Sequence, residues 1–66
     1  MQVLVNGSAK ELPADTTLRG LIELLGAAPE GIAVAVNGEV VPRREHADRV
    51  LAEGDKVEVI RAVGGG

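Results

Sequence analysis

Few residues of this 66-residue chain carry groups that could act as catalysts. There is one histidine, His46, and no cysteine, so a thiolate nucleophile, a disulfide framework and a cysteine metal site are all excluded. A triad of Ser8, His46 and Asp48 would need a preformed cleft, and a chain this small has little room for one. His46 lies in a polar stretch, where we expect a solvated side chain. An enzyme with its own active site is therefore the weakest interpretation.

The C-terminal sequence RAVGGG suggests a different kind of chemistry, at the end of the main chain. Gly64, Gly65 and Gly66 have no side chains, so any role of theirs depends on backbone shape or on the terminal carboxylate. A terminal carboxylate has an ordinary pKa of about 3.5, which makes it anionic and a poor electrophile at neutral pH. Glycine termini are also common as frayed ends. The tail alone does not decide between these two interpretations.

Composition and charge narrow the class of partner. The formal net charge is −3 and there is no Phe, Trp or Tyr. A polyanion as partner is disfavoured because phosphate binding needs a basic surplus, and bases cannot stack on absent aromatic rings. A neutral or basic protein surface is the expected partner, with no nucleic acid and no membrane. The N-terminus lacks a signal-peptide pattern and no apolar run approaches the roughly 20 residues of a membrane span, so we expect a soluble, cytoplasmic protein.

Two hairpins are predicted from their turn residues. Residues 2–5 and 8–12 read as strands joined by Asn6-Gly7, and Pro13 ends the second strand. The segment IAVAVNGEVV, residues 32–41, repeats the pattern around a second Asn-Gly pair. This dipeptide favours tight hairpins because both positions tolerate positive φ. A final, most regular strand, KVEVIRA, follows the turn at residues 53–55.

One helix lies between the hairpins. Leu18, Leu21, Ile22 and Leu25 fall at i, i+3, i+4 and i+7, which places them on one stripe. Thr17 is the expected N-cap, with Thr16 and Asp15 as rivals, and Gly26 the expected C-terminal stop. Gly20 costs about 1 kcal/mol relative to Ala within the helix. Either a close approach to the sheet requires it, or the fold simply tolerates it. Residues 43–51 are weakly patterned and predict at most a single helical turn.

This order predicts an α+β fold of two layers, a mixed four- to five-stranded sheet packed on one helix. The helix-facing side of the sheet is expected to carry Val3, Val5, Ile32, Val34, Val36, Val57 and Val59. The opposite side carries a shallow apolar face without cover, which we define as the outer face: Leu4, Ala33, Ala35, Ile60 and Ala62. Isolated exposed apolar groups need no explanation, whereas a contiguous patch marks docking. We therefore treat the outer face as a candidate partner-binding surface.

With these elements in place, the whole chain resembles a known family. The ββαββ order, VAVNGEVVPR in the middle, EGDKVEVI near the end and the terminal Gly-Gly are similar to the sulfur carrier proteins of the ubiquitin-like β-grasp fold, in particular the ThiS family of thiamin biosynthesis. The resemblance implies residues 1–62 as the β-grasp domain and residues 63–66 as a flexible tail. The terminal Gly-Gly of the family falls on Gly65 and Gly66, and Gly64 departs from the usual pattern.

The resemblance also implies a chemistry for the tail. An ATP-dependent, ThiF-like adenylyltransferase would join the Gly66 carboxylate to AMP, and a sulfur donor such as a cysteine desulfurase would then supply the sulfur of a thiocarboxylate. Thiazole synthase would receive that sulfur. The chain itself would bind no cofactor or metal and would be a protein cosubstrate rather than an enzyme. Arg43, Arg44 and Arg61 are expected to be solvated; the alternative is that they pair with acidic groups on a partner and steer encounter.

Two alternatives stay open on the sequence alone. A related β-grasp carrier for molybdopterin synthesis or tRNA thiolation, or a ubiquitin-like modifier joined to lysines, would have the same tail. A non-covalent β-grasp interaction module would have the same fold, and in it the glycines would be inert.

Overall fold

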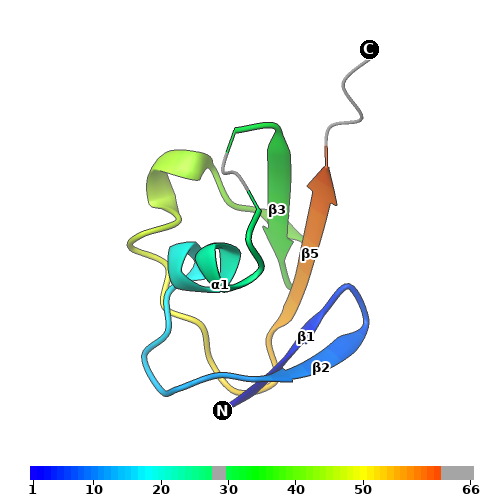
Figure 1. Ribbon diagram of the computed structural model, residues 1–66, viewed down its shortest axis with the longest axis vertical. Helices are drawn as coiled ribbons and strands as arrows, with labels where there is room; N and C mark the ends of the chain where they lie inside the picture. Colours follow the sequence, from blue (N-terminus) through cyan, green and yellow to red (C-terminus); the bar gives the residue numbers. More distant parts are fainter. Residues whose placement is uncertain (28–29, 62–66) are drawn as a thin grey trace.

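A computed structural model describes residues 1–27 and 30–61 of the chain. Ala62 and the predicted tail, residues 63–66, lie outside the described residues. The elements are β1 (Gln2–Val5), β2 (Ser8–Glu11), α1 (Leu18–Leu24), β3 (Ile32–Val36), β4 (Glu39–Val40), the 3₁₀ helix η1 (Arg43–Glu45) and β5 (Lys56–Arg61). The strands form one sheet in the order β2-β1-β5-β3-β4. Figure 1 shows β5 running through the middle of this sheet.

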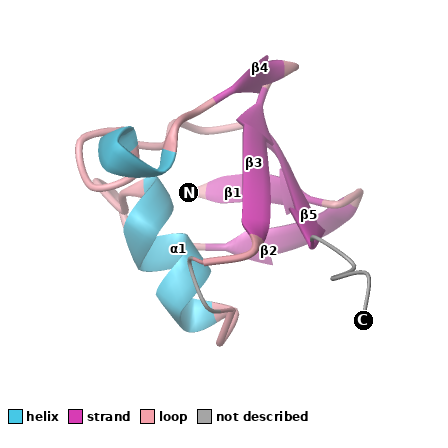
Figure 2. Ribbon diagram, turned by 90° about the horizontal axis from the view of Figure 1, so that it is seen from above, coloured by secondary structure: helices cyan, strands magenta, loops and turns pink. Residues whose placement is uncertain are grey.

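The sheet is mixed, as predicted. β1 pairs with β2 and β3 with β4 in antiparallel hairpins. β5 pairs parallel with β1 and antiparallel with β3. Seen from above in Figure 2, α1 lies on one side of the sheet and covers only that side. The two-layer α+β architecture is therefore confirmed, with five strands.

Both hairpin turns have the geometry that their sequence predicts. Asn6 and Gly7 have φ of 49° and 85°, and Asn37 and Gly38 have φ of 52° and 84°. Two consecutive residues with positive φ turn the chain with the right-handed twist that paired strands need. The Asn-Gly pairs therefore fix both hairpin registers.

The ends of α1 follow from capping. The Thr17 side chain accepts a hydrogen bond from the Gly20 N–H (3.1 Å), which confirms Thr17 as the N-cap. At the other end, the Gly26 N–H donates to the Glu23 carbonyl (3.0 Å) and the Ala27 N–H to the Ile22 carbonyl (3.3 Å). With φ of 71° at Gly26, this is a Schellman motif. The predicted stop is confirmed.

Gly20 does not approach the sheet. A Cβ placed on it would meet only the side chains of Thr17, at 3.4 Å, and Thr16, at 3.5 Å. These are ordinary van der Waals distances. The expectation of a close approach is wrong, and nothing in the described structure requires glycine there.

The core is aliphatic and lies between α1 and the sheet. Three of the four stripe residues are buried, and Leu25 is partly buried against them. From the sheet, Val3, Val5, Val34, Val36 and Val57 are buried, with Ile32 and Val59 partly buried. Three further core residues come from segments that flank the regular elements: Leu12, Val41 and Leu51. Within the described residues no helix is long and apolar enough to cross a membrane.

Candidate functional site

The site that the sequence predicts begins where β5 ends. Arg61, the last described residue, pairs with Ile32 at the start of β3. The sequence continues for five residues to Gly66. Fully extended, five residues span at most about 17 Å. Whatever partner acts on the terminal carboxylate must therefore reach within about that distance of Arg61.

β5 is held unequally by its two neighbours. On one side, five residue pairs join it to β3, from Val36↔Val57 to Ile32↔Arg61. On the other side, β1 pairs only with Lys56 and Val57. The parallel ladder ends there because β1 gives way to its turn.

The side chain of Asn6 extends the parallel ladder by one step. Its Oδ1 accepts a hydrogen bond from the Val59 N–H (2.9 Å), and its Nδ2 donates to the Val59 carbonyl (3.3 Å). The Asn6 backbone N–H donates to the Val57 carbonyl (2.9 Å). A turn residue thereby holds the later half of β5, close to where the tail begins.

Asn37 does the same at the start of β5. Its backbone N–H donates to the Lys56 carbonyl (2.7 Å) and its Oδ1 accepts from the Lys56 N–H (3.0 Å). Its Nδ2 donates to Asp55 Oδ1 (3.0 Å), and Asp55 Oδ2 accepts from the Ala52 N–H (2.8 Å). Each Asn-Gly turn therefore anchors one part of β5. The sequence alone predicts these asparagines only as turn residues.

The outer face lies on the side of the sheet away from α1. Ala33 and Ile60 are exposed and Leu4 and Ala35 are half-buried, while Ala62 lies outside the described residues. The register joins them across strands, with Ala33 opposite Ile60. Two residues not predicted from the sequence share this face: Val40, 70% exposed and opposite Ala35, and Ala9, opposite Leu4. The strand pairings within the two hairpins, once known, place both residues on the outer face.

Charged groups border this apolar surface. By strand alternation Lys56 and Glu58 project from β5 on the outer face, and with Leu4 and Asn6 they line a shallow hollow.

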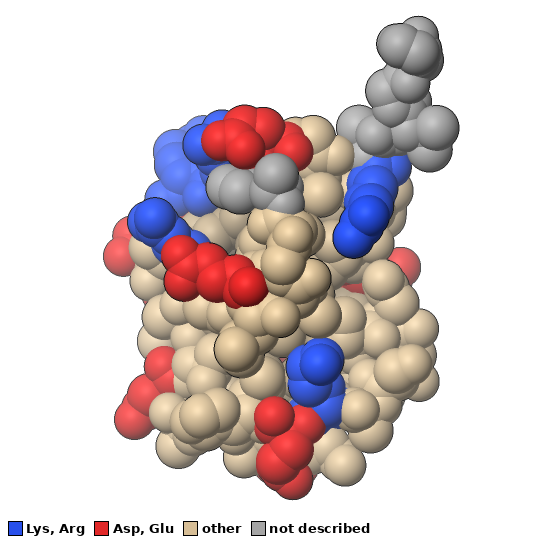
Figure 3. Space-filling view, viewed as in Figure 1, with Lys and Arg blue, Asp and Glu red and all other residues tan. Residues whose placement is uncertain are grey.

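On the face of the molecule seen in Figure 3, basic and acidic side chains are interspersed, and neither sign of charge forms a separate patch. Of the three arginines considered as steering groups, Arg43 pairs with Glu30 (3.2 Å) and Arg44 lies 4.0 Å from Glu45. All three arginines are exposed.

His46 is not solvated, and the prediction for it is wrong. It is 4% exposed, and its Nε2 lies 3.0 Å from the Val41 carbonyl oxygen. The 3₁₀ turn of η1 carries the imidazole inward, although its sequence neighbours are polar. The backbone carbonyl of His46 also accepts a hydrogen bond from the Arg19 N–H (3.0 Å), so His46 joins η1 to α1. Neither Ser8 nor Asp48 is among its hydrogen-bond partners, and no cluster of three metal-ligating side chains occurs in residues 1–27 and 30–61.

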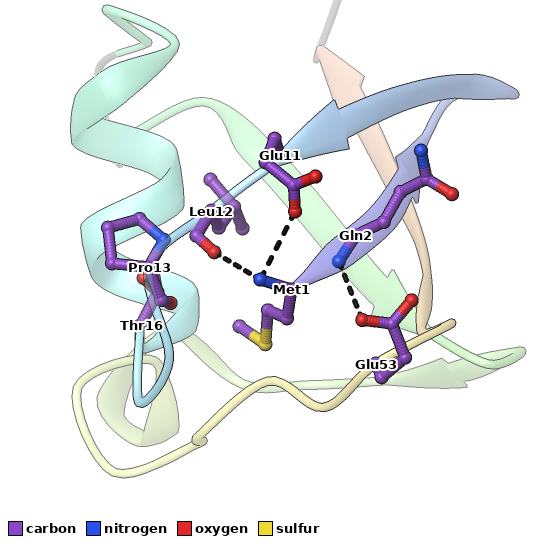
Figure 4. Close-up of polar contacts among 7 residues, drawn as sticks. All are labelled: Met1, Gln2, Glu11, Leu12, Pro13, Thr16 and Glu53. Carbon is purple, nitrogen blue, oxygen red and sulfur yellow. Dashed lines mark hydrogen bonds and ion pairs between the residues drawn. The ribbon is translucent and has the colours of Figure 1, made fainter.

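The N-terminus is held at the end of the sheet that lies away from Arg61 (Figure 4). The Met1 ammonium group donates to the Leu12 carbonyl (2.6 Å) and lies 3.2 Å from a Glu11 carboxylate oxygen. The Gln2 N–H donates to Glu53 Oε1 (2.9 Å). Because β1 and β5 are parallel, these contacts lie beside the start of β5 and away from Arg61. They fix the body of the domain without bearing on the tail.

Comparison with known proteins identifies the family. The sequence profile of the ThiS family matches residues 3–66. The chain belongs to the ThiS family. Sulfur carrier protein ThiS of Escherichia coli K12 is 33% identical over 66 residues, and the match covers the whole of both chains. The family is that of the sulfur carrier proteins of thiamin biosynthesis, so the chain is classed with carriers rather than with enzymes.

The fold agrees with this assignment. The crystal structure of ThiS from Geobacter metallireducens superposes with a TM-score of 0.84 at 32% identity, covering all of both chains. The predicted β-grasp fold is therefore confirmed. A protein named thiazole synthase, from Magnetococcus marinus, is 44% identical over 66 residues. This chain spans only 20% of that longer protein.

Proposed function

We propose that this ThiS-family protein carries sulfur as a thiocarboxylate on its C-terminal residue, Gly66. The carboxylate attacks ATP and forms an acyl-adenylate with release of pyrophosphate. A sulfide equivalent then attacks the acyl carbon and displaces AMP, which leaves C(=O)S⁻ in place of the carboxylate. Adenylation is needed because a carboxylate is a poor electrophile and AMP is a good leaving group.

The observation that carries this proposal is that the family match runs to the last residue, Gly66. The rest of the chain is consistent with it. No cysteine is present to hold sulfur as a persulfide. Glycines without Cβ allow the end of the chain to enter a narrow site and to present its acyl carbon at the angle that attack requires.

The partners follow from the same proposal. A ThiF-like adenylyltransferase supplies the ATP-dependent step, and thiazole synthase receives the sulfur. A cysteine desulfurase or similar donor supplies the sulfur as a persulfide, and two thiols of a reductant release its outer sulfur as sulfide while they are oxidised to a disulfide. Thiazole synthase is favoured as acceptor because a protein of that name in Magnetococcus marinus contains a segment 44% identical to this chain. In that protein a carrier-like segment and the named synthase share one polypeptide.

We assign the outer face to docking of thiazole synthase. Exposed apolar side chains on β4 and β5, Val40 (70%) and Ile60 (58%), stand beside the small Ala33 and Ala35. A flat surface of this kind fits a reversible contact, since small side chains leave no deep pockets to fill. Lys56 and Glu58 at its border fix the orientation of the partner through charge.

Intact mass spectrometry tests the proposal. The chain is incubated with a ThiF-like adenylyltransferase, MgATP and a sulfur donor, and the expected product is heavier by the replacement of one oxygen by one sulfur. The matched control is the same chain with Gly66 as its carboxamide, which cannot be adenylated and should keep its mass. An unchanged mass of the native chain with all components active would refute the proposal.

A further inference from the structure

The end of β5 that leads to the tail depends on one side chain for its attachment to β1. In the described residues, the backbone ladder between these strands stops at Val57, where the Asn6 N–H donates to the Val57 carbonyl (2.9 Å). Beyond Val57, β5 continues to Arg61 with backbone pairing to β3 only. Two hydrogen bonds between the Asn6 side chain and the Val59 backbone, one accepted and one donated by Asn6, replace the missing ladder step.

This attachment is specific in its geometry. The Asn6 amide offers one acceptor and one donor, and both are used on the same residue, Val59. A φ of 49° at Asn6 directs the side chain toward β5 while the main chain turns away into β2. Asparagine is one of the few residues that tolerates this φ and also carries an amide.

The attachment also lies beside the surface assigned to docking. Asn6, Leu4 and Glu58 line the same shallow hollow on the outer face. A partner seated on this face therefore meets the body of the carrier next to the point that fixes the direction of β5. Five residues separate Arg61 from the terminal carboxylate, so the carboxylate lies within about 17 Å of the end of β5.

We propose that Asn6 is a positioning residue that aims the C-terminal tail at the active site of the docked partner. The inference rests on the proposed function and adds to it the group that sets the direction of the tail. Without the two bonds to Val59, the end of β5 is held on one side only and can swing away from β1. The terminal carbonyl then spends less time where the attacking atom needs it, which lowers the rate of transfer rather than the affinity of docking.

The chain provides a matched control. Asn37 has the same residue type, the same turn and nearly the same φ, 52°, and it also holds β5 through its side chain. It acts at Lys56, however, at the other end of the strand. Asn37→Gly and Asn6→Gly therefore remove comparable hydrogen bonds and keep the permitted φ, but only Asn6→Gly frees the end that leads to the tail.

The test measures kcat and KM of sulfur transfer to thiazole synthase, with the native chain and both variants supplied as their thiocarboxylates. For Asn6→Gly we expect kcat to fall by about tenfold or more, on the scale of misplacing reacting groups by an ångström, with KM little changed. For Asn37→Gly we expect kcat within about twofold of the native value on the same scale. Asn6→Asp, which keeps the acceptor for the Val59 N–H and loses the donor, should lie between.

A second measurement is independent of activity. Amide hydrogen exchange at Val59 should be faster in Asn6→Gly and unchanged in Asn37→Gly, because only the first removes the acceptor of that N–H. If Asn6→Gly does not fold, Asn6→Asp serves in the kinetic experiment, where an unchanged kcat would overturn the inference. Equal kcat values for the two glycine variants, or native exchange at Val59 in Asn6→Gly, would overturn the inference. A native chain that is never thiocarboxylated refutes the proposed function itself, and with it any role of Asn6 in transfer.

Discussion

Two glycines at opposite ends of α1 should respond to the same substitution with opposite sign. Gly20 lies in the first turn and has room for a methyl group, since the atoms nearest to an added Cβ are Thr17 Oγ1 at 3.4 Å and Thr16 Cγ2 at 3.5 Å. Ala avoids the backbone entropy that glycine loses, so Gly20→Ala should stabilise the fold by roughly 0.5–1 kcal/mol. Gly26 has φ of 71°, where an L-residue costs about 1–2 kcal/mol. Gly26→Ala should therefore destabilise the fold by that amount.

Thermal unfolding followed by circular dichroism measures both effects. In a domain of this size 1 kcal/mol shifts Tm by about 4–8 °C, so Gly20→Ala should raise Tm by roughly 2–8 °C and Gly26→Ala should lower it by about 4 °C or more. The helix cap is retained in both variants, because Thr17 still accepts from the backbone N–H at position 20. A lower Tm for Gly20→Ala would refute the reasoning, since it would mean that the glycine meets a constraint absent from the described contacts.

The other predictions concern docking, the buried histidine and the tail. Ile60→Asp should weaken binding to thiazole synthase, measured by calorimetry, by about tenfold or more, as expected for an apolar contact near the centre of an interface. Leu24→Asp, on α1, is the matched control because Leu24 is 65% exposed and Ile60 58%, and it should leave the affinity unchanged. Equal affinities of the two variants would exclude the outer face. His46→Ala should lower the free energy of urea unfolding by about 1–3 kcal/mol, because it leaves a buried carbonyl without its partner, and an unchanged midpoint would contradict the buried position. Deleting residues 65–66 should abolish sulfur transfer while Tm and docking affinity persist, whereas an inert-tail interaction module would keep its function.

Much of the fold could be predicted because its signals are local. Val3 and Val5 alternate with polar or outer-face residues, and the α1 stripe repeats with the period of a helix. The Asn-Gly pairs predict the geometry of both hairpin turns, and Gly26 predicts the end of the helix. Each of these patterns depends on residues within one turn or one strand, so the sequence displays them directly.

The contacts that hold β5 could not be predicted in this way. Asn6 and Val59 are separated by 53 positions, and only the register between β1 and β5 brings them together. The turn alone accounts for an asparagine at position 6. The sequence therefore gives no sign that its side chain also binds β5. Asn37 was missed for the same reason.

The buried residues that the sequence did not predict lie in segments without a period. Leu12 and Val41 directly follow β2 and β4, and Leu51 lies in the irregular segment between η1 and β5, yet all three are in the core. His46 is carried inward by a 3₁₀ turn whose neighbours in sequence are polar. In such segments the side-chain direction depends on the path of the chain in space, which periodicity does not report.

The central claim is that the reactive atom of this protein is the carbonyl carbon of its last residue. Fragmentation of the product by tandem mass spectrometry, after reaction with adenylyltransferase, MgATP and sulfur donor, locates the added sulfur directly. We expect the mass increase on the fragment that ends at Gly66 and on no internal fragment. Sulfur found on any other residue, or a fully reacted mixture in which the C-terminal fragment keeps its oxygen, would contradict the account.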